Sequence, residues 1–134
     1  MAVVVPPAPA RGRLILDTGG LLAWAYGDAF VRAAILEAGR RAVLVVAPAV
    51  VIAQAIRGGP ADAPINQALK RVGEFTPVTP TLARQAGLLL GATRTTDVVD
   101  ALVVAEALRI LPSVILTSDP SDIRLLVQSD PAHP

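Results

Sequence analysis

The sequence predicts an α/β fold, in which helices are layered around a mostly parallel sheet. Short apolar segments rich in β-branched residues alternate along the chain with segments of helical periodicity. The apolar segments are continuous rather than alternating, as is typical of parallel strands covered on both faces. The 134 residues are enough for one domain with an ordinary core.

The first predicted strand is the apolar stretch RLILD, at residues 13–17. A helix follows it, and Thr18 can serve as the N-cap of that helix. Residues 28–40 have apolar side chains at helical spacing and predict a second helix. The β-branched run at residues 42–47 then predicts a buried strand. Residues 1–12, rich in proline and alanine, are expected to be disordered or loosely attached.

Proline and glycine mark the boundaries of the next elements. Pro48 is expected at the start of a helix, and Gly58 and Gly59 end it. A further helix is predicted at residues 63–72. The stretch FTPVTP, at residues 75–80, predicts a short edge strand, because proline cannot donate a hydrogen bond to a neighbouring strand.

The last third of the chain predicts two helices, one strand and a final helix or turn. One helix begins at about Thr81, and the other has Thr96 or Asp97 as its cap. The stretch SVILTS, at residues 113–118, has the apolar and β-branched character of a buried strand. The final helix or turn opens with DPSD, within residues 119–128.

The composition argues against several kinds of site. The only histidine, His133, lies in the expected tail, residues 129–134, outside the domain expected at residues 13–128. A Ser-His-Asp relay or a histidine-rich zinc site is therefore not expected.

The absence of cysteine is compatible with a cytoplasmic location, which we expect. The start of the chain lacks the features of a signal peptide, and the apolar run 42–56 is too short for a membrane span and is split by Pro48.

Aspartates follow two of the predicted strands. Asp17 ends the first strand and Asp119 comes after the last one, and ligands of such folds collect at the carboxyl ends of the strands. Asp100 lies among apolar residues in VVDALVV, where a carboxylate is costly unless it meets a partner or a cation. Clustered carboxylates suit Mg²⁺ or Mn²⁺. This pattern indicates metal-dependent phosphoryl transfer on nucleic acid.

Two more aspartates stand at helical spacing from this set. Asp97 precedes Asp100 by three residues and Asp122 follows Asp119 by three, so each pair can share a helix face. Asp97 is either an accessory acid or simply the cap of its helix, since aspartate is a favoured N-cap residue. The interpretation as a helix cap alone applies to Asp28 and Asp62.

Four motifs occur in order over residues 13–127: LILDTGGLLAW, VVAPAVVIAQAIRGG, TTDVVDALVVAEAL and VILTSDPSDIRLL. Together they resemble the PIN-domain family, and specifically the VapC-like toxins of bacterial toxin–antitoxin pairs. The resemblance implies a three-layer α/β/α sandwich and a Mg²⁺- or Mn²⁺-dependent endoribonuclease. It also implies an RNA substrate, a homodimer and inhibition by a cognate antitoxin protein. The choice of RNA over DNA comes from this resemblance and not from the spacing of the residues.

The resemblance also assigns roles to residues. It implies that catalysis and metal binding belong to Asp17, Asp100 and Asp119. Asp122 would be an accessory acid near the same site. Thr18 and Ser118 would be hydroxyl groups that line the site, and Ser118 could orient a ligand or a water molecule.

One position departs from the family pattern. Where the family usually has a glutamate, this sequence has Gln54, which can offer a carbonyl oxygen but no negative charge. Either the site works with fewer carboxylates or at higher metal concentration, or the chain is a degenerate PIN domain that binds RNA or protein without cutting, or the glutamine was introduced to trap an inactive form. Arg84, Arg94 and Asn66 are weaker candidates for contacts at the site. Trp24 and Tyr26 are expected in the core or in a dimer interface.

Overall fold

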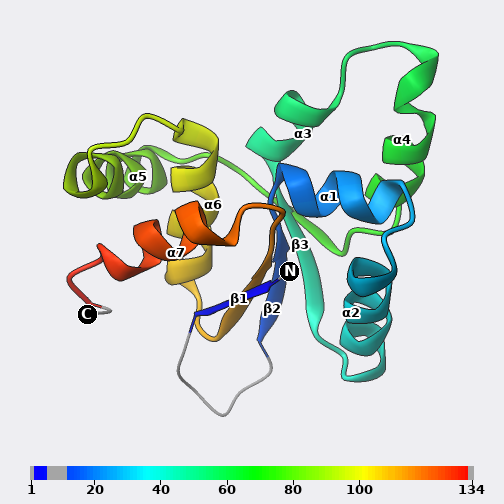
Figure 1. Cartoon of the computed structure of the whole chain (residues 1–134), viewed down its shortest axis with the longest axis horizontal. Coiled ribbons are helices and arrows are strands. Elements are labelled where there is room, and N and C mark those ends of the chain that lie inside the picture. The colour runs from blue at the N-terminus through cyan, green and yellow to red at the C-terminus, as the bar shows by residue number, and fades with distance from the viewer. Residues whose placement is uncertain (1, 6–11, 133–134) are drawn as a thin grey trace.

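A five-stranded sheet forms the centre of the structure, a computed structural model that describes residues 2–5 and 12–132 (Figure 1). Its strands are β1 (Ala2–Val5), β2 (Arg13–Leu16), β3 (Leu44–Pro48), β4 (Glu74–Thr76) and β5 (Ser113–Leu116). The strand order is β1-β5-β2-β3-β4, and every neighbouring pair is parallel except β1 with β5. The predicted α/β class with a mostly parallel sheet is therefore confirmed.

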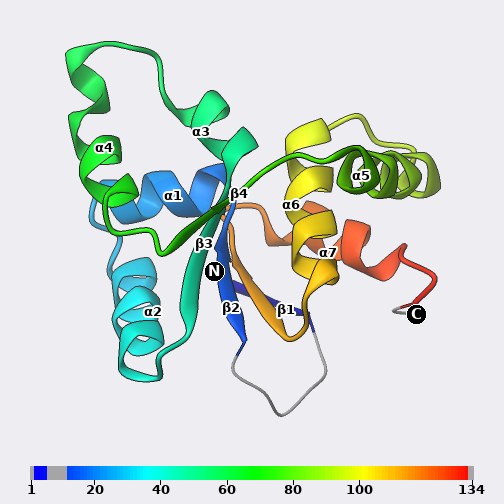
Figure 2. The ribbon, with the colours of Figure 1, turned by 180° about the vertical axis from the view of Figure 1, so that it is seen from behind.

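Helices cover both faces of the sheet, which gives the three layers of an α/β/α sandwich (Figures 1 and 2). The helices are α1 (Thr18–Ala25), α2 (Ala29–Arg40), α3 (Ala49–Ala55), α4 (Ala63–Leu69), α5 (Pro80–Thr93), α6 (Val98–Arg109) and α7 (Pro120–Gln128), with a 3₁₀ turn at Pro60–Asp62. Helices α5, α6 and α7 lie on one side of the sheet, and α1, α2 and α4 lie on the other. None of the helices in the described residues combines the length and the apolar character that crossing a membrane requires.

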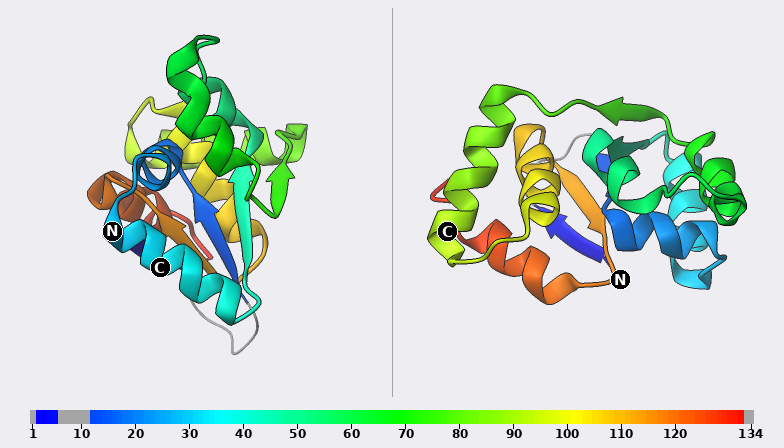
Figure 3. Two further views of the ribbon diagram at one scale, coloured as in Figure 1. Left: turned by 90° about the vertical axis from the view of Figure 1, so that its right-hand side faces the viewer. Right: turned by 90° about the horizontal axis from the view of Figure 1, so that it is seen from above.

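Helix α6 is the most deeply buried helix of the described chain. It lies between the sheet and α5, as the view from above shows (Figure 3). All seven residues from Ala101 to Ala107 are buried, because α6 is covered by strands on one side and by α5 and α7 on others. This position explains why the sequence of α6 is apolar on nearly all its faces. It also fixes Asp100, in the first turn of α6, against the rest of the domain.

The N-terminal segment differs from its expectation. Residues 1–12 were expected to be disordered or loosely attached, but Ala2–Val5 form the edge strand β1 and pair antiparallel with β5, with Val3 opposite Ile115. The strand signal is only four residues long, and its partner lies at the other end of the chain, so local sequence patterns could not reveal the pairing. Residues 1 and 6–11 lie outside the described residues, as does His133.

Asp62 also differs from its expectation. It was interpreted as a helix cap, but its side chain makes no capping hydrogen bond. Its buried carboxylate accepts hydrogen bonds from the backbone N–H groups of Arg57 and Gly58, and thereby holds the loop between α3 and α4. The predicted edge strand is confirmed in a shorter form, because β4 stops at Thr76, directly before Pro77.

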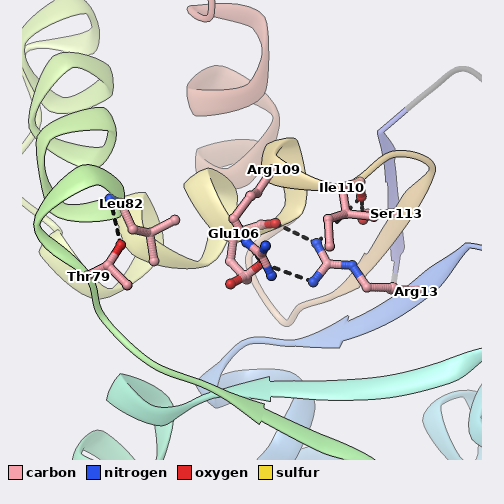
Figure 4. A network of polar contacts seen from close by, with 7 residues as sticks. All are labelled: Arg13, Thr79, Leu82, Glu106, Arg109, Ile110 and Ser113. Carbon is pink, nitrogen blue, oxygen red and sulfur yellow. Dashed lines mark hydrogen bonds and ion pairs between the residues drawn. The ribbon is translucent and has the colours of Figure 1, made fainter.

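A buried ion pair joins the sheet to α6 (Figure 4). The guanidinium group of Arg13, at the start of β2, donates to Oε2 of Glu106 at 2.9 Å and to the backbone oxygen of Glu106 at 2.6 Å. Arg109 donates to the same Oε2 atom at 2.8 Å. Both partners of the Arg13–Glu106 pair are almost fully buried, with side chains 7% and 2% exposed. Each therefore depends on the other for compensation of its charge.

Candidate functional site

The carboxyl ends of β2 and β5 bring Asp17 next to Thr117. The two strands are parallel and in register, with Leu16 beside Leu116, so the residues that follow them are neighbours. The backbone N–H of Asp17 donates to the oxygen of Leu116 at 3.2 Å, which continues this pairing by one residue. Asp17 is only 4% exposed. One carboxylate of the predicted set is thus held at the edge of the sheet where ligands of such folds collect.

The start of α1 is held by the carboxylate of Asp17. Its Oδ1 atom accepts a hydrogen bond from the N–H of Gly20 at 2.7 Å, so Asp17 is the N-cap of α1. The expectation that Thr18 caps this helix was wrong, because Thr18 is already its first helical residue. The cap fixes the carboxylate of Asp17 and satisfies one of the free N–H groups of the helix.

Two glycines let α1 approach the end of β5 closely. A Cβ atom on Gly20 would collide with the backbone oxygen of Leu116, and a Cβ atom on Gly19 would collide with the side chain of Ser118. The two glycines after Thr18 are therefore explained by packing. This close contact brings the segment after Asp17 against the turn that carries Ser118 and Asp119.

Asp100 is the group whose ionisation is most perturbed. Its pKa is raised from the ordinary value of 3.8 to about 7, first by burial and then by the negative charges of Asp97, Asp17, Asp119 and Asp122, in that order of importance. The other four aspartates are thus close enough to Asp100 to disfavour its negative charge. These electrostatic interactions place the four aspartates in the neighbourhood of Asp100, and the roles assigned to them from the sequence stay a prediction. We refer to these five residues as the aspartate cluster.

Asp97 and Asp119, each directly before a helix, differ in their hydrogen bonds. Asp97 is the N-cap of α6, and its Oδ1 atom accepts from the N–H of Asp100 at 2.9 Å. Asp119 stands at the same position before α7, but its side chain makes no capping hydrogen bond. The pKa of the exposed Asp122 is raised, first by a hydrogen bond with Asp119 and then by the charge of Asp119.

Thr117 is a site residue that the sequence analysis did not select. Its buried hydroxyl group interacts with the carboxyl group of Asp17 and accepts a hydrogen bond from the N–H of Asp119 at 2.9 Å. Burial raises the pKa of Asp17, and the hydrogen bond from Thr117 opposes that shift. The motif TSD contains two hydroxyl residues, and only the register of β5 with β2 reveals that Thr117, not the exposed Ser118, faces Asp17.

Gln54 is brought to the same end of the sheet by α3. The hydroxyl group of Thr18 donates a hydrogen bond to Oε1 of Gln54. Since Thr18 follows Asp17 directly, this contact places the side chain of Gln54 beside the cluster. The oxygen through which Gln54 could bind a cation is therefore already used as an acceptor by Thr18.

The donors of the cluster are suited to a hard divalent cation. All are carboxylate oxygens, and within the described residues no arginine or lysine forms an ion pair with any of the five aspartates. As the side chains stand, no three acidic or histidine groups in the described part of the chain are gathered so that they could hold a metal ion. Mg²⁺ commonly binds through only one or two carboxylates and keeps several waters. The cluster fits this kind of binding and does not form a closed cage.

The weaker candidates from the sequence occupy different places. Trp24 is buried, as expected, and the guanidinium group of Arg71 lies 5.3 Å from the centre of its ring. Tyr26 is exposed and takes no part in the core. Arg94 ends α5 in a left-handed conformation and is exposed, as are Arg84 on α5 and Asn66 on α4.

Comparison with known proteins adds no assignment. No protein-family model matches the chain, and no curated protein matches it. Functional proposals for this chain therefore rest on the aspartate cluster and on the motif resemblance described above.

The raised pKa values predict how stability depends on pH. Asp100 binds its proton up to a pH of about 7 in the folded chain but only up to about 3.8 when unfolded. Because the folded state then holds more protons than the unfolded state, the free energy of unfolding is expected to fall as the pH rises from about 4 to about 7. Urea denaturation at several pH values, with a chelator present, measures this fall. Asp100→Asn should reduce the fall, and an equal slope in both proteins would contradict the assignment.

Proposed function

We propose that this chain is a metal-dependent endoribonuclease of the PIN-domain type, acting in the cytoplasm as the toxin of a toxin–antitoxin pair. In this proposal Mg²⁺ or Mn²⁺ is held by Asp17, Asp100 and Asp119, and the substrate is RNA. A homodimer and inhibition by a cognate antitoxin belong to the same proposal. The observation that carries it is the cluster of five aspartates at the carboxyl edge of the sheet, without a paired cation among the described residues.

The residues of the cluster have distinct tasks in this proposal. When bound, the ion would activate a water molecule and offset negative charge at the phosphate. Asp17 holds its carboxylate in a fixed orientation through Gly20, which favours a defined ligand position. Asp100, with a pKa of about 7, can hold or release a proton near neutral pH. No histidine and no side-chain nucleophile is needed for hydrolysis by this route.

The alternative is a degenerate PIN domain that binds RNA or protein without cutting. The observation that favours it is Gln54, an uncharged side chain whose oxygen is occupied by Thr18. Both possibilities share the same fold and the same cluster. They differ in whether the cluster binds a divalent ion tightly enough for hydrolysis.

Gln54→Glu separates the two possibilities. We expect the new carboxylate to tighten Mn²⁺ binding by about tenfold and to raise the rate of RNA cleavage, because it adds a charged ligand beside Asp17. Calorimetric titration with Mn²⁺ gives the affinity, and cleavage of a mixed RNA pool gives the rate. Gln128→Glu, the same change at the exposed end of α7, should alter neither.

The outcomes of this experiment lead to different conclusions. If the unchanged chain cuts RNA and Gln54→Glu cuts it faster, the nuclease proposal is supported and Gln54 weakens the site. If only Gln54→Glu cuts, the fold supports the chemistry but this chain is a silent form. If neither folded protein cuts any RNA, the proposed activity is wrong and the binding alternative takes its place.

A further inference from the structure

A pocket of about 700 Å³ lies on the side of the sheet that α5, α6 and α7 cover, away from the aspartate cluster. It is bounded by the start of α5, the end of α6 and the segment that follows α7. Glu106, in its wall, follows Asp100 by six residues, which corresponds to about 9 Å along the axis of α6. None of the five cluster aspartates lines this pocket. Its volume is in the range of pockets that bind small molecules.

The wall of the pocket is mainly apolar. Leu82 contributes from α5, and Ala105 and Leu108 contribute from α6. Polar and charged groups also line the pocket: Thr79, Thr81 and Gln85 around the start of α5, Glu106 and Arg109 on α6, and Asp130 after α7. A mainly apolar wall with polar groups that can fix the orientation of a ligand is the usual composition of a site for a small organic molecule.

Glu106 is the polar group that gives this pocket a specific chemistry. The residue is 1% exposed, and one of its oxygens, Oε2, accepts hydrogen bonds from both Arg13 and Arg109. The other oxygen, Oε1, accepts no hydrogen bond from any described residue, although the residue lines the pocket. Figure 4 shows Glu106 between Arg13 on one side and Thr79 and Leu82 on the other. Oε1 is not fully enclosed, since the buried side-chain atoms without a partner among the described residues are Nε of Arg13 and Oγ1 of Thr76. A donor in the pocket can therefore reach Oε1 and use its free acceptor position.

The charge of Glu106 determines which donor fits. Arg13 and Arg109 place two positive charges beside Glu106, and Asp130, which also lines the pocket, adds a second carboxylate. A cationic ligand would be repelled by these guanidinium groups, and an anionic one would meet the carboxylate itself. A neutral donor, an N–H or an O–H, satisfies Oε1 without adding charge to a largely desolvated place.

We propose that the pocket between α5 and α6 binds an uncharged, mainly apolar small molecule that carries one N–H or O–H donor directed at Oε1 of Glu106. The apolar body of the ligand packs against Leu82, Ala105 and Leu108. The donor replaces the missing hydrogen bond of the carboxylate. This site is independent of the proposed nuclease activity, because it uses neither the aspartate cluster nor a metal ion.

The test compares two bicyclic probes of nearly the same shape, indole and benzofuran, in titrations of the full chain followed by ¹H–¹⁵N NMR. Indole carries one N–H donor and benzofuran carries none. We expect indole to shift the amide signals at the start of α5 and the end of α6, and to bind about tenfold more tightly than benzofuran. A pocket that recognised only apolar surface would bind the less polar benzofuran at least as tightly, and that result would overturn the proposal.

A matched pair of variants locates the binding site. Thr81→Trp places a large side chain in the pocket from its exposed rim, and Arg84→Trp places the same side chain on the outside of α5. Indole binding should be lost in Thr81→Trp and kept in Arg84→Trp, with circular dichroism to show that both are folded. If Thr81→Trp does not fold, Gln85→Trp, at another wall position, replaces it. Unchanged indole binding in a folded pocket-filling variant would overturn the proposal. So would the absence of indole binding to the unchanged chain at a probe concentration of about 10 mM.

Discussion

Asp100→Asn is expected to abolish RNA cleavage and, in the same protein, to raise thermal stability above pH 7. Asparagine keeps the shape of the side chain but cannot hold a negative charge, so cleavage should fall by about 100-fold or more. The same change removes a partly buried carboxylate whose pKa is raised to about 7, first by burial and then by the charges of four other aspartates. The repulsion that the unchanged protein carries at pH 8 is then absent. Loss of activity combined with a higher melting temperature identifies a residue retained for function rather than for folding.

The control for this prediction is Asp28→Asn. Asp28 caps α2 by accepting a hydrogen bond from the N–H of Val31 at 3.0 Å, and α1 separates it along the chain from Asp17. Asparagine caps helices about as well as aspartate, so both activity and melting temperature should stay nearly unchanged. If Asp100→Asn is folded and still cuts RNA at the original rate, the cluster is not the catalytic site. If its melting temperature falls, the repulsion inferred for Asp100 is absent.

Arg13→Met is expected to cause the largest loss of stability, about 3 kcal/mol or more. The substitution leaves Glu106, 1% exposed, with Arg109 as its remaining charged partner. A buried carboxylate that loses its main partner is strongly destabilising, because the cost of its desolvation is no longer offset. Urea denaturation monitored by circular dichroism measures the effect.

Two further variants show whether the loss comes from the unpaired charge. In the double variant Arg13→Met with Glu106→Leu, both charges are gone, and stability should return to within about 1 kcal/mol of the unchanged protein. Arg40→Met removes one partner of an exposed ion pair with Glu37 and should cost less than about 1 kcal/mol. A loss for Arg13→Met no greater than that for Arg40→Met would show that the buried pair contributes little.

Much of the fold could be predicted because the signals are local. The alternation of β-branched runs with helical periodicity predicts the α/β class, and proline and glycine place several element boundaries within a few residues. The gathering of Asp17, Asp100 and Asp119 could also be predicted, because parallel strands end at a common edge. Both predictions need only the order of the elements along the chain and the rule that parallel strands end at a common edge of the sheet.

Other features could not be predicted, because they depend on pairings between distant residues. The strand β1 pairs only with β5, and the buried Glu106 pairs with Arg13, 93 positions earlier in the chain. The hydrogen bond from Thr18 to Gln54 likewise depends on where α3, which follows β3 directly, lies relative to α1. No periodicity in the sequence distinguishes Glu106 from any other glutamate on a helix.

The sequence by itself therefore determined which elements form and which aspartates follow the strands, since backbone preference and apolar periodicity act over a few neighbouring residues. The tertiary structure alone decided that Asp17 caps α1, that Thr117 faces Asp17, and that a pocket opens above Glu106. The physical reason is that burial and hydrogen-bond satisfaction are properties of the packed chain. A carboxylate has an unusual pKa or an unused acceptor only once distant segments have excluded water from it.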